Sequence, residues 1–190
     1  TELVSELLGL TTDERDFVYL SDGGHFENLG VYELVRRRCP CIIVSDAGQD
    51  GGHTFDDLGN AVEKCRADFG IDIEIDVAAL RPVGLASHSH CAVGTIRYDQ
   101  ADRTRAPGTI LYLKSSLTGD EPSDVLRYAA LHPEFPHQST SDQFFDESQF
   151  ESYRALGYHI GRQVFDVVRA RPGASMTPAE MFRLLRQRWT

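Results

Sequence analysis

The sequence lacks long apolar runs and any surplus of positive charge. No apolar run is longer than residues 41–44, which is far below the roughly 20 residues that cross a bilayer. No charged segment followed by an apolar one marks a secretory signal. Lys and Arg number 19 against 29 Asp and Glu, a formal net charge of −10. Because an acidic surface repels phosphate backbones, nucleic-acid binding is disfavoured.

Cysteine is scarce and poorly spaced for a cofactor or metal. Two of the four cysteines stand in Cys39-Pro-Cys41, which lacks the two-residue spacer of a zinc knuckle or thioredoxin-like motif. A chain of 190 residues can form a core without disulfide staples. We therefore expect free thiols in a reducing compartment. This favours the cytoplasm, or the cytoplasmic side of a membrane reached through segments outside the chain.

The first half of the sequence alternates strand-like and helix-like segments. The continuous apolar run at 41–46 is typical of a strand buried on both faces, and the strict alternation at 71–77 indicates a half-exposed strand. Strands are expected at 17–20, 41–46 and 71–77, and helices at 29–38 and 55–68. This order predicts a three-layer α/β/α domain with right-handed crossovers, formed by residues 1–190 together.

The second half is predicted to add a hairpin and then helices. Residues 92–98 and 109–114 read as antiparallel strands at the edge of a mixed sheet. After a helix at 123–131, a polar, aromatic loop at 133–146 leads to a helix at 147–171. The buried stripe of that helix is predicted to hold Phe150, Tyr153, Leu156, Ile160, Val164 and Val168. Thr177-Pro178-Ala179-Glu180 is a capping box that begins a last helix, with Met181, Leu184 and Leu185 facing inward.

A carboxylate and two glycines follow the first predicted strand. Asp22-Gly23-Gly24 joins that strand to a helix, at the position where open α/β sheets bind ligands. The glycines permit tight backbone and the close approach of another segment. An isolated Asp-Gly-Gly is more often only a polar turn, so the wider pattern decides its meaning.

That wider pattern resembles the aspartate segment of patatin-like phospholipases, which are related to the catalytic domain of cytosolic phospholipase A2. In that family a strand ends in Asp-Gly-Gly or a close variant, and a polar residue such as Asn, a helix and a hydrophobic strand follow. Here the match is Asp22-Gly23-Gly24, Asn28, the helix to Arg38 and the strand at 41–46. Residues 55–60 and 135–146 resemble the bacterial branch of the group. The resemblance implies the C-terminal portion of a patatin-like α/β/α domain, with extra C-terminal helices.

The resemblance also implies a mechanism, a Ser–Asp dyad that hydrolyses lipid or phospholipid esters without a metal or cofactor. Asp22 corresponds to the catalytic base, and Gly23 and Gly24 shape its loop. A carboxylate can take the serine proton when partial burial raises its proton affinity. Two neighbours remain open to alternatives. His25 lines the pocket or makes a structural hydrogen bond, and Asn28 caps the following helix or steadies the Asp22 loop.

The nucleophile that such a dyad requires is missing. None of the serines, Ser21, Ser45, Ser87 and Ser89 included, stands in Gly-x-Ser-x-Gly. Because the chain begins with Thr1 rather than Met, we expect a piece of a longer protein whose serine-bearing part lies upstream. The piece alone should not hydrolyse esters efficiently, and membrane association would depend on the missing segments. An uncovered sheet edge favours self-association, which sedimentation would detect or refute.

Two rival functions remain. The first is a metal-dependent hydrolase, for which His88, His90 and Cys91 form one group and Asp46, Asp50, His53 and Asp57 another. Histidines two apart on a strand share one face. However, residues 46–51 lack a ligand at the third position of a calcium-binding loop, and no second histidine cluster at ligand spacing supports zinc. The second rival is a non-catalytic interaction or regulatory module that has lost its nucleophile, which the upstream sequence would reveal.

The loop at 133–146 carries a further hypothesis. Its aromatic residues Phe135, Phe144 and Phe145 are either part of an acyl-binding wall or anchors of the loop to the core. A change in chain-length preference on Phe144→Ser would support the wall, and unchanged selectivity would count against it.

Overall fold

A mixed four-stranded sheet forms the centre of the protein. The computed structural model describes residues 4, 7–10, 12, 14, 22–170 and 176–190. Within them the strand order is β1-β4-β3-β2, with β1 and β4 parallel and the other pairs antiparallel. The strands are β1 (Cys41–Asp46), β2 (Ile73–Glu74), β3 (Cys91–Ile96) and β4 (Gly108–Lys114).

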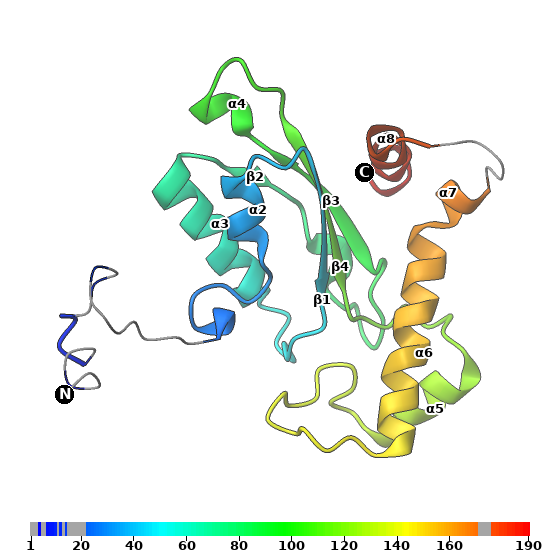
Figure 1. Cartoon of the computed structure of the whole chain (residues 1–190). Helices are drawn as coiled ribbons and strands as arrows, with labels where there is room; N and C mark the ends of the chain where they lie inside the picture. The colour runs from blue at the N-terminus through cyan, green and yellow to red at the C-terminus, as the bar shows by residue number, and fades with distance from the viewer. Residues whose placement is uncertain (1–3, 5–6, 11, 13, 15–21, 171–175) are drawn as a thin grey trace.

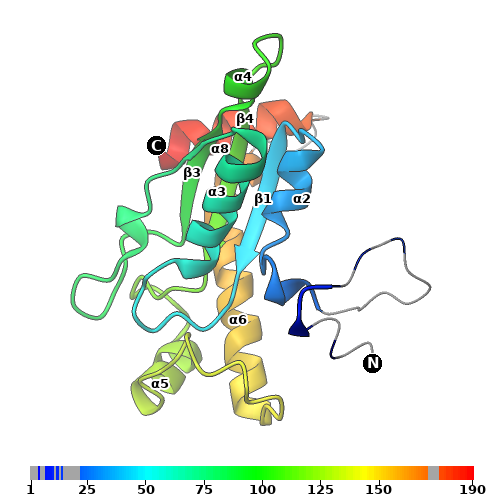
Figure 2. The ribbon, with the colours of Figure 1, turned by 90° about the vertical axis from the view of Figure 1, so that its left-hand side faces the viewer.

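Helices cover both faces of this sheet. On one face lie α2 (Val31–Arg36) and α3 (Asp56–Phe69), and on the other α6 (Glu147–Val164) and α8 (Pro178–Trp189) (Figures 1 and 2). The short α7 (Asp166–Arg169) joins α6 to α8, and α5 (Ser123–Leu131) packs beside the start of α6. The connections contain η1 (Gly23–His25), η2 (Ala78–Leu80) and α4 (Tyr98–Ala101). The predicted α/β/α architecture with a mixed sheet is confirmed.

Each face of the sheet has its own apolar core. Along β4, Ile110 and Tyr112 belong to the core beneath α2 and α3, whereas Leu111 belongs to the core beneath α6 and α8. All three side chains are fully buried. β4 is therefore buried on both faces.

β1 was predicted to have that double burial, and this prediction was wrong. Ile42 and Val44 are buried beneath the α2–α3 layer, but Ile43 is 45% exposed and Ser45 is exposed. Among the described residues β1 is the terminal strand of the sheet, and the α6–α8 layer leaves part of its second face open.

The other strand predictions held in part. The strand expected at 17–20 lies outside the described residues, and the segment 71–77 forms a strand only at Ile73–Glu74. The antiparallel hairpin of β3 and β4 is confirmed, with Val93 opposite Leu111. Its position at the sheet edge was wrong, because β4 also pairs in parallel with β1.

The helix predicted at 147–171 ends earlier, and a different residue of its first turn is buried. Its regular part stops at Val164, and the predicted core residue Phe150 is 61% exposed. Leu156, Ile160 and Val164 are buried as predicted. In the first turn, however, the inward position belongs to Gln149, whose Nε2 donates to Gln138 Oε1 and Asp142 Oδ2, each at 3.3 Å. A hydrogen-bonded amide thus replaces the predicted aromatic ring.

The capping box of α8 forms as predicted. Thr177 Oγ1 accepts from the Glu180 amide at 3.3 Å, and Glu180 Oε2 accepts from the Thr177 amide at 2.9 Å. Phe182, Leu184 and Leu185 are buried, and Met181 is half-buried. Among the described helices, none has the length and apolarity needed to cross a membrane.

Loss of this cap should destabilise the protein measurably. Thr177→Ala removes the side-chain oxygen that accepts the Glu180 amide, so the free energy of unfolding should fall by about 1 kcal/mol. Urea denaturation would measure the change. Thr177→Ser keeps the oxygen and should retain most of the stability. Equal losses in the two variants would show that the cap is not the cause.

Candidate functional site

Asp22 lies on an exposed loop in which the side chains of Asp22 and Asn28 come close to Gly24. Asp22 has extended backbone and immediately precedes η1, and Gly23, Gly24 and His25 are exposed with it. A Cβ atom built on Gly24 would lie 3.1 Å from Asn28 Oδ1 and 3.2 Å from Asp22 Oδ1, whereas one on Gly23 would meet no atom of the described residues within 4 Å. Glycine at position 24 therefore lets the carboxylate and the amide approach the backbone.

Asn28 ties this loop to α3. Its Nδ2 donates to Asp57 Oδ2 at 3.2 Å, in the first turn of that helix. This matches the predicted steadying role, although the bond joins two side chains rather than a side chain and the backbone. The predicted capping role belongs to a neighbour, because Glu27 Oε1 and Oε2 accept from the Leu29 and Tyr32 amides at 2.6 and 3.1 Å.

A buried charged group stands next to this loop, at the carboxyl ends of β1 and β4. Lys114 Nζ lies 2.9 Å from Asp46 Oδ2 and 3.6 Å from Asp50 Oδ2, and the Tyr112 hydroxyl donates to Asp46. The side chains of Lys114 and Asp46 are only 2% and 1% exposed. Lys114 thus neutralises carboxylates that would otherwise be buried without a counter-charge.

Close contacts connect the Asp22 loop to the buried group of Asp46 and Lys114. Asp57 binds Asn28, and a Cβ atom on Gly48 would lie 3.2 Å from Asp57 Oδ2 and 3.3 Å from Asp46 Oδ1. Asp46, Asp57 and Lys114 line one cavity of about 100 Å³. The Asp22 loop therefore lies at the end of the sheet where open α/β folds bind ligands.

The surroundings of Asp50 and Tyr112 favour an ionised carboxylate and an un-ionised tyrosine. Burial opposes ionisation of Asp50, but hydrogen bonds from Thr54 and Phe55 and the charge of Lys114 outweigh it, so the pKa of Asp50 is lowered. Burial, followed by the hydrogen bond to Asp46, raises the pKa of Tyr112. Tyr112 therefore serves as a hydrogen-bond donor to the carboxylate.

Two histidines lie in the neighbouring loops. The rings of His53 and His137 meet edge to face with centroids 4.8 Å apart, and both line a pocket of about 310 Å³ together with Phe135. Burial, and then the nearby His53, lowers the pKa of His137 to about 4. His137 is consequently neutral at physiological pH, so it adds no positive charge to the pocket.

The aromatic residues of the loop at 133–146 divide into anchors and an exposed ring. Phe135 is buried between Tyr128 and Tyr153, with ring centroids at 5.1 and 4.8 Å. Phe145 stacks on Tyr153 at 5.6 Å, whereas Phe144 is 91% exposed. Phe135 thus anchors the loop, and the acyl-wall hypothesis stays a prediction for Phe144.

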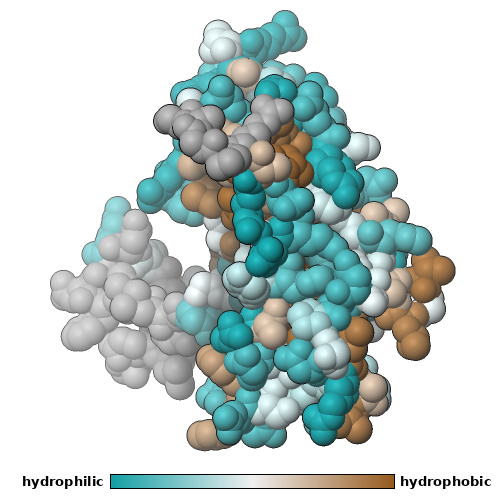
Figure 3. Space-filling view, turned by 90° about the vertical axis from the view of Figure 1, so that its right-hand side faces the viewer, coloured by the Kyte–Doolittle hydropathy of each residue, from teal (hydrophilic) through white to brown (hydrophobic). Residues whose placement is uncertain are grey.

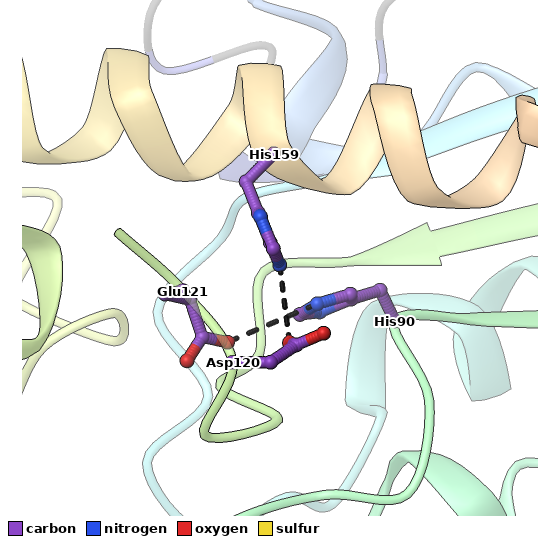
Figure 4. Close-up of side chains that lie close together, drawn as sticks. All are labelled: His90, Asp120, Glu121 and His159. Carbon is purple, nitrogen blue, oxygen red and sulfur yellow. Dashed lines mark hydrogen bonds and ion pairs between the residues drawn. The ribbon is translucent and has the colours of Figure 1, made fainter. Parts of the chain in front are cut away.

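The first metal-ligand group suggested by the sequence is not brought together, whereas Asp46, Asp50 and Asp57 of the second line the cavity beside Lys114. His88 is exposed and His90 is fully buried. Both residues precede β3, which begins at Cys91, so they do not share one face of a strand as predicted. His90 instead meets Asp120, Glu121 and His159, and one ligand atom from each lies within 4.8 Å of the others (Figure 4). Sequence spacing could not reveal this group, because its members come from three distant segments.

Comparison of the chain with protein-family models, curated proteins and solved structures found no match. The resemblance to patatin-like phospholipases thus rests on the motifs in the sequence.

Proposed function

We propose that this chain is the acid-bearing part of a lipid acyl-ester hydrolase, phospholipase-like and of the patatin kind. Asp22 is the base of a Ser–Asp dyad, and a serine outside this chain is the nucleophile. The observation that carries the proposal is the position of the Asp22 loop. It is held by the Asn28–Asp57 hydrogen bond at the carboxyl end of the sheet.

The space beside Gly23, as far as the described residues define it, supports this role. A dyad needs the serine hydroxyl within hydrogen-bond reach of the carboxylate, and a turn that carries the serine has room where a Cβ on Gly23 would meet no described atom within 4 Å. Asp22 is exposed in this chain. The docked turn would remove it from water and raise its proton affinity.

In the proposed reaction the serine oxygen attacks the ester carbonyl as its proton passes to Asp22. That proton then goes to the departing alcohol, and water hydrolyses the acyl-enzyme with the same carboxylate as base. The buried Asp46 group is assigned no proton transfer, because Lys114 already pairs with its carboxylates. That pairing also makes the group a poor metal site, which disfavours metal-dependent hydrolysis at this cavity.

A fluorophosphonate probe, which reacts with activated serines, tests the proposal against a non-catalytic module. The complete protein should be labelled at one serine outside these 190 residues and should release fatty acid from phospholipid vesicles. The isolated chain should do neither. A heat-denatured sample of the complete protein is the control for labelling without activation. An unlabelled, inactive complete protein would favour the non-catalytic module.

A further inference from the structure

The group formed by His90, Asp120, Glu121 and His159 shares no residue with the Asp22 loop. We call it the His–carboxylate cluster. His90 immediately precedes β3, Asp120 and Glu121 follow β4, and His159 lies on α6. The four side chains point toward one another (Figure 4). His159 Nε2 lies 3.2 Å from Asp120 Oδ1, and His90 Nε2 lies 3.8 Å from Glu121 Oε1.

Both ring nitrogens of His90 have hydroxyl partners, Ser116 Oγ at 3.0 Å from Nδ1 and Thr118 Oγ1 at 3.0 Å from Nε2. Ser116 Oγ also has two backbone carbonyl acceptors, Ser89 O at 3.3 Å and Lys114 O at 3.2 Å. When the Ser116 proton goes to a carbonyl, the Ser116 oxygen accepts the proton of His90 Nδ1, and Nε2 of the neutral ring carries a lone pair. In that tautomer His90 Nε2 presents its lone pair to the cluster.

The carboxylates of the cluster accept hydrogen bonds from several donors: Glu121 from the Thr118 and Gly119 amides, and Asp120 Oδ2 from Gln163 Nε2. The Thr118 hydroxyl has one proton and three acceptors within reach, Asp120 Oδ1 at 2.6 Å, Glu121 Oε1 at 3.2 Å and His90 Nε2 at 3.0 Å. Among the described residues, only these two histidines form ion pairs with Asp120 and Glu121. In contrast to the Asp46 group, the cluster has no lysine to neutralise it.

We propose that the His–carboxylate cluster binds a divalent transition-metal ion of the zinc class. Imidazole nitrogen and carboxylate oxygen are suitable ligands for such an ion. Four ligand atoms about 2.1 Å from a tetrahedral zinc lie about 3.4 Å from one another. The separation of His159 Nε2 from Asp120 Oδ1, 3.2 Å, is slightly below that value, and the separation of His90 Nε2 from Glu121 Oε1, 3.8 Å, is slightly above it. The ion replaces the His159 proton that now bridges to Asp120, and Ser116 orients His90 for it.

The ion can enter from solvent. Asp120 and His159 line a cleft of about 750 Å³, together with charged residues such as Arg154 and Arg162. The Asp120 side chain is 61% exposed, whereas His90 and Glu121 are fully buried. The face of the molecule seen in Figure 3 is largely hydrophilic around separate apolar patches. A bound ion would fasten α6 to the segments that border β3 and β4.

Metal binding by the isolated chain tests this inference without reference to ester hydrolysis. Equilibrium dialysis of the metal-stripped chain against Zn²⁺ should give about one tight ion per chain, and Zn²⁺ should raise the Tm. Loss of a residue that only orients a metal ligand typically weakens binding about 10- to 100-fold. We therefore expect a loss of about 10-fold for Ser116→Ala and of at least about 100-fold for His159→Ala.

The controls separate this site from other ligands. His88→Ala changes an exposed histidine outside the cluster and should leave zinc affinity unchanged. Asp120→Asn alters an exposed ligand without threatening folding and should weaken binding as His159→Ala does. The Co²⁺ complex should lack the charge-transfer band of a thiolate ligand. Such a band would show that the ion binds instead at a cysteine, such as the half-buried Cys39 or Cys41. A wild-type chain that binds no Zn²⁺, a thiolate band, or equal losses in His88→Ala and His159→Ala would overturn the inference.

Discussion

Asp22→Asn in the complete protein is expected to lower kcat for ester hydrolysis by about 10²- to 10⁴-fold, the usual contribution of a general base. The amide cannot accept the serine proton, although it has almost the same shape as the carboxylate. KM should change little, because Asp22 is assigned to proton transfer and not to lipid binding. Hydrolysis of a fluorogenic phospholipid over a range of concentrations would separate the two constants.

A matched variant and a stability measurement make this result specific. Asp102→Asn removes an exposed carboxylate at the opposite end of the sheet, between α4 and β4, and should leave kcat unchanged. Both variants should unfold at the temperature of the wild-type protein, since both carboxylates are exposed. Near-normal turnover by the Asp22 variant would remove this residue from the mechanism. A loss of turnover together with a lowered Tm would indicate a structural role instead.

The largest loss of stability is expected from Lys114→Met. Lys114 is 2% exposed and is paired with Asp46 and Asp50. Its removal leaves buried carboxylates without a counter-charge. Breaking a buried ion pair in this way typically costs about 3–5 kcal/mol, so the midpoint of urea denaturation should fall sharply.

Two comparisons test whether burial is the reason. In the double variant Lys114→Met with Asp46→Asn the uncompensated charge on Asp46 is also gone, so part of the lost stability should return. Arg154→Met breaks an exposed pair with Glu151, in which both side chains are more than half exposed, and it should change stability little because solvent screens such pairs. Equal effects of Lys114→Met and Arg154→Met would contradict this account.

Local features of the structure were predictable from short stretches of sequence. The capping box at Thr177 depends on residues three apart in one helical turn, and the α3 helix follows from its apolar periodicity. The β3–β4 hairpin follows from two apolar segments around a polar turn. In each case the determining contacts lie close together along the chain, so the pattern contains the necessary information.

Features that depend on distant segments were missed or misplaced. The inward place of Gln149 depends on partners in the preceding loop. The apolar run of β1 does not tell how much of its second face a helix will cover. Hydrophobic periodicity describes one element, whereas burial depends on which elements meet.

The sequence by itself determined the α/β alternation, the position of the last helix and the Asp-Gly-Gly motif on which the proposed dyad rests. Only the tertiary structure decided that β4 is central, that Asn28 binds Asp57, and that His90 meets His159. The physical reason is distance along the chain. Propensity and capping act within a few residues, whereas a binding site needs side chains that packing brings together from segments far apart.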